Sequence, residues 1–166
     1  MVTSLFRDRE SAERAYNSLR TRGYSDEDVS LMMSDDTRKT HFSDDDKSDF
    51  DSKAWEGAGK GAAIGGTVGA TLAAIAAIGT SVALPGIGLL VAGPLAAGIL
   101  GAGAGGLTGG LIGALVGSGI PEDRAKEYEK GINEGGILVG VNARNDEDAE
   151  YFENDWRTNR GEGVYR

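Results

Sequence analysis

The pattern of apolar and polar positions in the first 33 residues predicts a strand, a helix and a second strand. Val2–Phe6 is a short apolar run, and Asp8 after it is a residue type that caps helix N-termini. Gly23 is a typical helix stop, and Val29–Met33 is a second apolar run. The expected helix carries its apolar residues on one face, at helical spacing: Ala12, Ala15, Tyr16 and Leu19.

The last 30 residues predict the same order of elements. Ile137–Ala143 is a strand, Asn145 can cap the next helix, Gly161 follows that helix, and Val164 with Tyr165 is a short last strand. The helix has Ala149, Phe152 and Trp156 on one face. A shift of 137 residues aligns five identical pairs in the two helices: Ala12 with Ala149, Glu13 with Glu150, Asn17 with Asn154, Arg20 with Arg157 and Thr21 with Thr158. We interpret this as an internal repeat; chance resemblance between two amphipathic helices is the alternative.

Two βαβ units predict an α+β fold of the ferredoxin-like kind. In that arrangement the units pair into one four-stranded antiparallel sheet with both helices on one face. We therefore expect one buried helix face from each unit: Ala12, Ala15 and Leu19, with Phe152 and Trp156.

A long uncharged segment separates the two units. Gly61–Pro121 contains no Asp, Glu, Lys, Arg or His. Pro85-Gly86 is its strongest break, which predicts a helical hairpin of Lys53–Thr80 and Leu89–Ser118, with Pro94 delaying or kinking the second helix. A further helix should start at Pro121, with an apolar face of Ala125, Tyr128 and Ile132, and end at Gly135-Gly136. The expected organisation is an N-terminal half (1–33), an acidic linker (34–52), the hairpin (53–120), and a helix plus C-terminal half (121–166).

Glycines recur every four residues in both helices of the predicted hairpin. Because four residues advance about 400° around an α-helix, they form a groove in which another helix can approach closely, a glycine zipper. We expect these glycines to form an oligomer or hairpin interface, so that Gly109→Leu disrupts assembly and Gly109→Ala is mild. The two series are Gly57, Gly61, Gly65 and Gly69, and Gly101, Gly105, Gly109, Gly113 and Gly117.

The acidic net charge of the chain limits the kinds of molecule that it is expected to bind. The chain of 166 residues has a formal net charge of −9, which disfavours nucleic acid, and no cysteine for disulfides or thiolate chemistry. Charged residues Arg7–Glu10 stand where a secretory signal needs an apolar core, so we expect no targeting peptide.

Catalytic and metal-binding signals are weak. His41 is the single histidine and we expect it to be solvated, with no cavity that brings it near two carboxylates. Gly101, Gly103 and Gly106 match a dinucleotide-binding spacing but follow no predicted strand. An acidic cluster could gather Ca²⁺ but lacks the EF-hand pattern, so solvated charge is favoured: Asp44, Asp45, Asp46, Asp49 and Asp51. We predict no enzyme activity, no cofactor and no metal; Trp55 is either an interfacial anchor or ordinary packing.

Three stretches resemble a family of bacterial general-stress or heat-induced stress proteins. They are FRDRESAERAYNSLRTRGYSDEDVSLM, LPGIGLLVAGPLAAGILGAGAGG and LIGALVGSGIPEDRAKEYEKGINEGGILVGV. The resemblance implies an association with stress and a link to membranes, and it brings no catalytic residues. The long Asp-rich linker and the brief last strand depart from it.

The uncharged segment sets the functional hypothesis. It can pack against copies of itself in a soluble homo-oligomer, or insert into a bilayer, since each helix exceeds the roughly 20 residues a span needs. We predict a non-enzymatic, self-assembling protein in the cytoplasm or at the cytoplasmic membrane. The alternative is a carrier of lipid or a small apolar molecule that uses the hairpin as its cavity.

Overall fold

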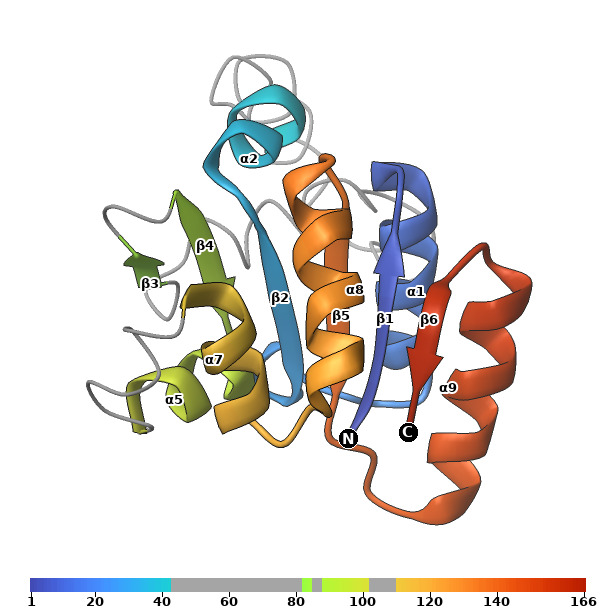
Figure 1. The fold of residues 1–166 in the computed structure, drawn as a ribbon. Helices are drawn as coiled ribbons and strands as arrows, with labels where there is room; N and C mark the ends of the chain where they lie inside the picture. Colours follow the sequence, from blue (N-terminus) through green and yellow to red (C-terminus); the bar gives the residue numbers. More distant parts are fainter. Residues whose placement is uncertain (43–81, 85–87, 102–109) are drawn as a thin grey trace, which may run out of the picture.

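The computed structural model describes residues 1–42, 82–84, 88–101 and 110–166 (Figure 1). The predicted helix at Lys53–Thr80, the Asp-rich cluster of 44–51 and Trp55 lie outside these residues. In chain order the elements are β1 (Val2–Phe6), α1 (Arg9–Thr21), a 3₁₀ turn (Asp26–Asp28), β2 (Val29–Ser34), α2 (Asp35–Phe42), β3 (Val82–Leu84), β4 (Leu89–Ala92), α5 (Pro94–Gly101), α7 (Gly110–Gly117), α8 (Glu122–Asn133), β5 (Ile137–Val141), α9 (Asp146–Thr158) and β6 (Glu162–Tyr165).

The strands of the described residues form one antiparallel sheet in the order β3-β4-β2-β5-β1-β6. β5 lies between β1 and β2, with Val141 opposite both Val2 and Val29. The two ends of the chain therefore share one sheet, as the sequence predicts. The prediction of four strands is incomplete, because β3 and β4 extend the sheet beyond β2.

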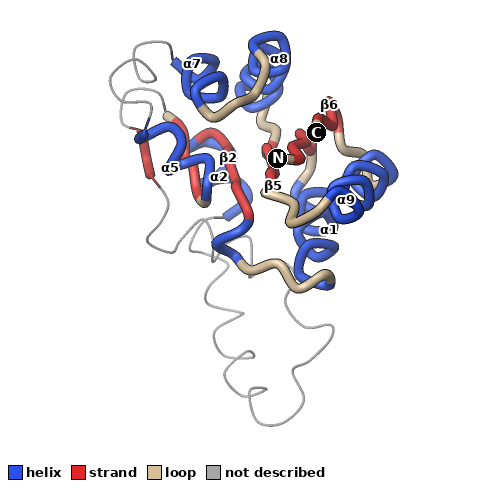
Figure 2. Tube along the Cα trace, turned by 90° about the horizontal axis from the view of Figure 1, so that it is seen from below, coloured by secondary structure: helices blue, strands red, loops and turns tan. Residues whose placement is uncertain are grey.

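Helices cover both faces of this sheet, whereas the sequence analysis placed the helices of the two units on one face and assigned none to the other. α1 and α9 lie on one face, and α8, with α7 and α5, lies on the opposite face (Figures 1 and 2). Strands β1 and β5 are buried at every position because side chains of both orientations meet a helix layer. The structure is thus a mixed α/β architecture of three layers.

The core on the α1 and α9 side is aromatic. Phe6 meets Trp156 edge to face at 6.1 Å between ring centroids, and Tyr24 meets Phe152 at 5.2 Å. The predicted buried set is confirmed, because each member is 0% exposed: Ala12, Ala15, Leu19, Phe152 and Trp156.

The two repeat helices have the same length and the same kind of cap. α1 and α9 both have 13 residues, and the shift of 137 carries the bounds of one onto the other. Asp8 accepts a hydrogen bond from the backbone N–H of Ser11 at 2.8 Å, and Asn145 accepts one from Asp148 at 2.7 Å. The repeat interpretation is therefore supported at the level of local structure.

The predicted second hairpin helix does not begin at Leu89, whereas the prediction that Pro94 delays its regular start is confirmed. Leu89–Ala92 is strand β4, which pairs with β2 and with β3, and the helix begins only at Pro94. A short apolar run fits a buried strand as well as a helix, and β2 offers unpaired backbone groups beside it. The break after Leu84 therefore joins two strands instead of two helices.

The predicted acidic linker is also partly folded. Asp35–Phe42 forms α2, whose first-turn acids Asp35 and Asp36 are favoured by the helix dipole. Thr37 is buried, and Phe42 packs against the core on the α1 side. In the part of the chain that the structure describes, no helix combines the length and the apolar character needed to cross a membrane.

Candidate functional site

The predicted interface glycines fall mostly outside the described residues. Gly57, Gly61, Gly65, Gly69, Gly105 and Gly109 lie there, as do Gly103 and Gly106 of the dinucleotide-like match. Gly101 is the last residue of α5, and Gly113 and Gly117 belong to α7. The geometry of the second series can therefore be followed at its end.

α7 has an inward and an outward side. Leu111, Ala114 and Leu115 are buried in the core that the helix shares with α8 and α5. Gly113 is half-buried, Gly117 is exposed, and Val116 between them is 42% exposed. The last two glycines of the series thus lie on the side of α7 that the described core does not fill.

α7 is held in this orientation by the turn that follows it. Ser118 donates its backbone N–H to the carbonyl of Ala114, and Gly119 takes a left-handed conformation with φ of 91°. Ile120 then turns back into the core, where it is 2% exposed. The hydrogen-bonded turn after α7 and the buried Ile120 therefore fix the direction in which Gly113 and Gly117 face.

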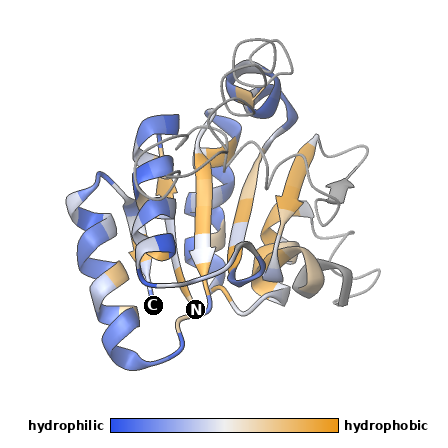
Figure 3. Ribbon diagram, turned by 180° about the vertical axis from the view of Figure 1, so that it is seen from behind, coloured by the Kyte–Doolittle hydropathy of each residue, from blue (hydrophilic) through white to orange (hydrophobic). Residues whose placement is uncertain are grey.

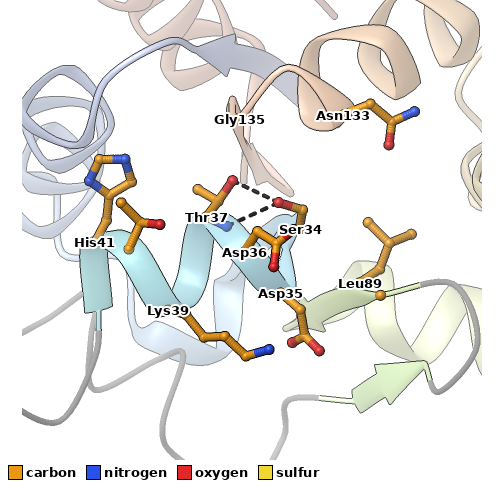
Figure 4. A pocket seen from close by; sticks show the side chains of 11 residues that line it. Ser34, Asp35, Asp36, Thr37, Lys39, His41, Leu89, Asn133 and Gly135 are labelled. Atoms are coloured by element: carbon orange, nitrogen blue, oxygen red, sulfur yellow. Dashed lines mark hydrogen bonds between the residues drawn. The ribbon is translucent and has the colours of Figure 1, made fainter.

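A polar hollow lies between α2, the start of β4 and the C-terminal end of α8 (Figure 4). Its volume is about 660 Å³. Its lining is mainly polar: Ser34, Asp35, Asp36, Thr37, Lys39, Thr40, His41, Gly88, Leu89, Asn133 and Gly135.

The hydroxyl groups in this hollow serve the local structure of α2. Ser34 accepts a hydrogen bond from the backbone N–H of Thr37 at 3.1 Å, and their hydroxyl oxygens are 2.8 Å apart. The backbone N–H of Asp35 donates to the carbonyl of Gly88 at 2.7 Å, which ties α2 to the turn before β4. Ser34 thus caps the N-terminus of α2.

His41 shares this hollow with two carboxylates, those of Asp35 and Asp36. His41 and Asp35 are nevertheless at opposite ends of α2, roughly 9 Å apart along the helix axis. Asp35 lies 3.6 Å from Arg38, and the His41 ring packs edge to face on Phe42 at 6.5 Å between centroids. This geometry does not form a nucleophile and base pair.

A polar cluster joins the two repeats at the opposite end of the sheet. Asp148 forms an ion pair with Arg22 and accepts a hydrogen bond from the Tyr24 hydroxyl at 2.7 Å. The Tyr24 hydroxyl bond, and then Arg22, lower the pKa of Asp148, while burial raises the pKa of Tyr24. Arg144 packs over the Tyr24 ring at 4.1 Å, and Arg22 over Tyr151 at 3.8 Å.

A second polar contact is buried under α8. The Tyr128 hydroxyl lies 3.0 Å from the Thr3 hydroxyl and donates to the carbonyl of Gly163, at 2.6 Å. Burial raises the pKa of Tyr128 to about 12. Sequence reasoning treated Tyr128 only as part of an apolar face; the signal that it missed is that a buried tyrosine hydroxyl needs a polar partner.

Comparison of the chain with protein-family models, with curated proteins and with solved structures gave no significant match.

Proposed function

We propose that this protein is a non-enzymatic protein that assembles with copies of itself through its glycine-rich segment. The observation that carries the proposal is the outward side of α7, where Gly113 and Gly117 flank the exposed Val116. Helices with small residues on one side pack closely, because their backbones can approach without intervening side chains. When a second copy covers an exposed apolar side chain beside such a groove, the free energy of the assembly is lowered.

The fold supports separate roles for the two repeats and for the glycine-rich segment. The order β2-β5-β1-β6 with helices α1 and α9 on one face agrees with the ferredoxin-like arrangement of two βαβ units, into which we propose the glycine-rich segment is inserted. In this arrangement the two repeats carry charged residues and remain in contact with solvent. The uncharged segment can contact another copy. Self-assembly needs no catalytic group.

The proposal extends to the setting of the protein. The resemblance to bacterial stress proteins supports a role in stress, in the cytoplasm or at the cytoplasmic membrane, with lipid as a second partner and nucleic acid excluded by charge. The alternative is a carrier of lipid or a small apolar molecule. It places the apolar cavity in the hairpin, most of which lies outside the described residues, and the polar hollow beside α2 is not that cavity.

The test uses Gly117, because it is exposed and a larger side chain there leaves the described core intact. Gly117→Leu should lower the mass of the assembly in size-exclusion chromatography with light scattering, whereas Gly117→Ala, the matched control, should keep it. Circular dichroism checks that both variants are folded. An assembly of Gly117→Leu with the mass and thermal stability of the wild type would contradict a role for this side of α7.

A further inference from the structure

The two outer strands of the sheet differ in how they are protected. β6 carries Glu162, which forms an ion pair with Arg7 at 2.8 Å, and its pairing with β1 shifts register between Thr3 and Leu5. Gly163 adds a left-handed kink with φ of 58°. Charges, register shifts and kinks are the devices by which proteins keep an edge strand from pairing with another chain.

β3 carries no charge, register shift or left-handed kink, and its only protection among the described residues is its length of three residues. Val82–Leu84 is uncharged and pairs in regular register with β4, from Val82 opposite Val91 to Leu84 opposite Leu89. Among the described residues no strand pairs with its other side. A regular, apolar edge strand is a template for a further strand from another chain.

The distribution of charge favours contact between two copies of this chain at this edge. The net charge of −9 makes two copies repel, except where neither carries charge. β3, β4, α5 and α7 all belong to the uncharged run of 61–121. Figure 3 shows the contrast, with hydrophilic colours on the helices near the termini and hydrophobic colours at β4 and the neighbouring helices.

We infer that β3 pairs antiparallel with β3 of a second copy across a two-fold axis at Ala83, which joins the two sheets into one. This inference rests on the proposed self-assembly and names a contact surface for it. A strand of three residues supplies few hydrogen bonds, so the packing of the glycine-rich helices must add to the contact. The two-fold axis places Ala83 of one copy directly opposite Ala83 of the other.

The test exploits that symmetry with opposite charges. In Ala83→Lys or Ala83→Glu, like charges face each other across the axis, so each variant alone should have a lower assembled mass than the wild type in light scattering. An equimolar mixture places Lys opposite Glu and should restore the wild-type mass. Asn154→Lys, on an exposed position of α9, is the control for added charge and should assemble normally.

The outcomes separate this inference from the proposal beneath it. A wild type that is monomeric overturns both. A wild type that assembles, with Ala83→Lys and Ala83→Glu assembling equally well or a mixture that stays dissociated, overturns only the β3 contact. Should both variants fail to fold, hydrogen exchange on the wild type decides. The amides of Val82–Leu84 should be more protected in the assembly than after dilution to monomer, and equal exchange overturns the contact.

Discussion

The Tyr128 hydroxyl joins three elements at a single buried point. It contacts the Thr3 side chain on β1 and the Gly163 carbonyl on β6, while its own helix, α8, spans Glu122–Asn133. Its hydrogen bonds therefore hold the last strand against the rest of the sheet. Such a hydroxyl matters for stability because its partners are shielded from water in the folded state. Without the hydroxyl they would be left without a hydrogen bond.

Tyr128→Phe should lower the free energy of unfolding by about 1–3 kcal/mol, because Thr3 and the Gly163 carbonyl lose their buried partner. Denaturant unfolding followed by circular dichroism measures this. Tyr151→Phe is the control, since Tyr151 is 37% exposed, and it should change stability little. Equal stability of Tyr128→Phe and the wild type would mean that the hydroxyl contributes nothing.

The raised pKa of Tyr128, about 12 in the folded protein against about 10 unfolded, predicts a pH dependence. The unfolded chain loses its proton first, so the contribution of Tyr128 is complete below pH 10 and is lost as the pH rises through 12. The difference in unfolding free energy between wild type and Tyr128→Phe should shrink over this range, by up to roughly 2–3 kcal/mol. A difference that stays constant from pH 9 to 12 would contradict the assigned pKa.

Arg160 takes the left-handed conformation, with φ of 65°, at the position after α9 where α1 has Gly23, with φ of 78°. A side chain in this conformation costs about 1–2 kcal/mol. Arg160→Gly should therefore raise thermal stability, and Gly23→Arg should lower it through the backbone alone, since nothing lies within 4 Å of a Cβ at Gly23. Changes of the same sign in the two variants would contradict this argument.

At the scale of elements, the attachment of the β3–β4 hairpin depends on Gly93. A Cβ at Gly93 would lie 1.9 Å from the carbonyl oxygen of Val29, and its φ is 78°. Because this carbonyl is backbone in a buried strand, it cannot move aside as a flexible side chain would. Gly93 therefore permits β4 to end against the start of β2.

Gly93→Ala should destabilise the protein by about 2 kcal/mol or more, since it adds a collision to a strained backbone. Gly88→Ala is a matched control in the same hairpin. Its φ is 66° but nothing lies within 4 Å of its Cβ, so it should cost only about 1 kcal/mol. Thermal unfolding of the two variants compares them, and an equal loss would show that the contact with Val29 is unimportant.

The elements of the two repeats were predictable because each has a local signal. Asp8 and Asn145 cap α1 and α9, and the apolar face of each helix repeats at helical spacing. β4 was not predictable, since Leu89–Ala92 is uniformly apolar and its strand form depends on pairing with β2. α2 had a signal that was missed, because Ser34 is a helix-capping residue type and the acids Asp35 and Asp36 follow it in the first turn.

The polar hollow had no signal in the sequence, because segments far apart in the chain form it. Its walls come from residues 34–41, 88–89 and 133–135, which the sheet topology brings together only after β4 pairs with β2. The outward side of α7 was predictable in part. The spacing of Gly113 and Gly117 indicates a stripe, but only the packing of Leu111 and Leu115 against α8 fixes the direction in which it faces.

At the scale of the whole molecule, charge is distributed unevenly. The folded repeats carry most of the charged side chains, while 61–121 carries none, although it supplies two strands and two helices of the described structure. Each copy thus has an acidic part that repels other copies and an uncharged part that can contact them. We propose that copies assemble through the uncharged part.

Light scattering on the purified wild-type chain tests this claim most directly. The measurement is the molar mass in detergent-free buffer over a wide range of protein concentration, at two salt concentrations. We expect a multiple of 17.2 kDa that dissociates only on strong dilution and does not weaken with salt, because the contact is apolar and salt screens the repulsion between acidic copies. A mass of 17.2 kDa at every concentration would contradict it.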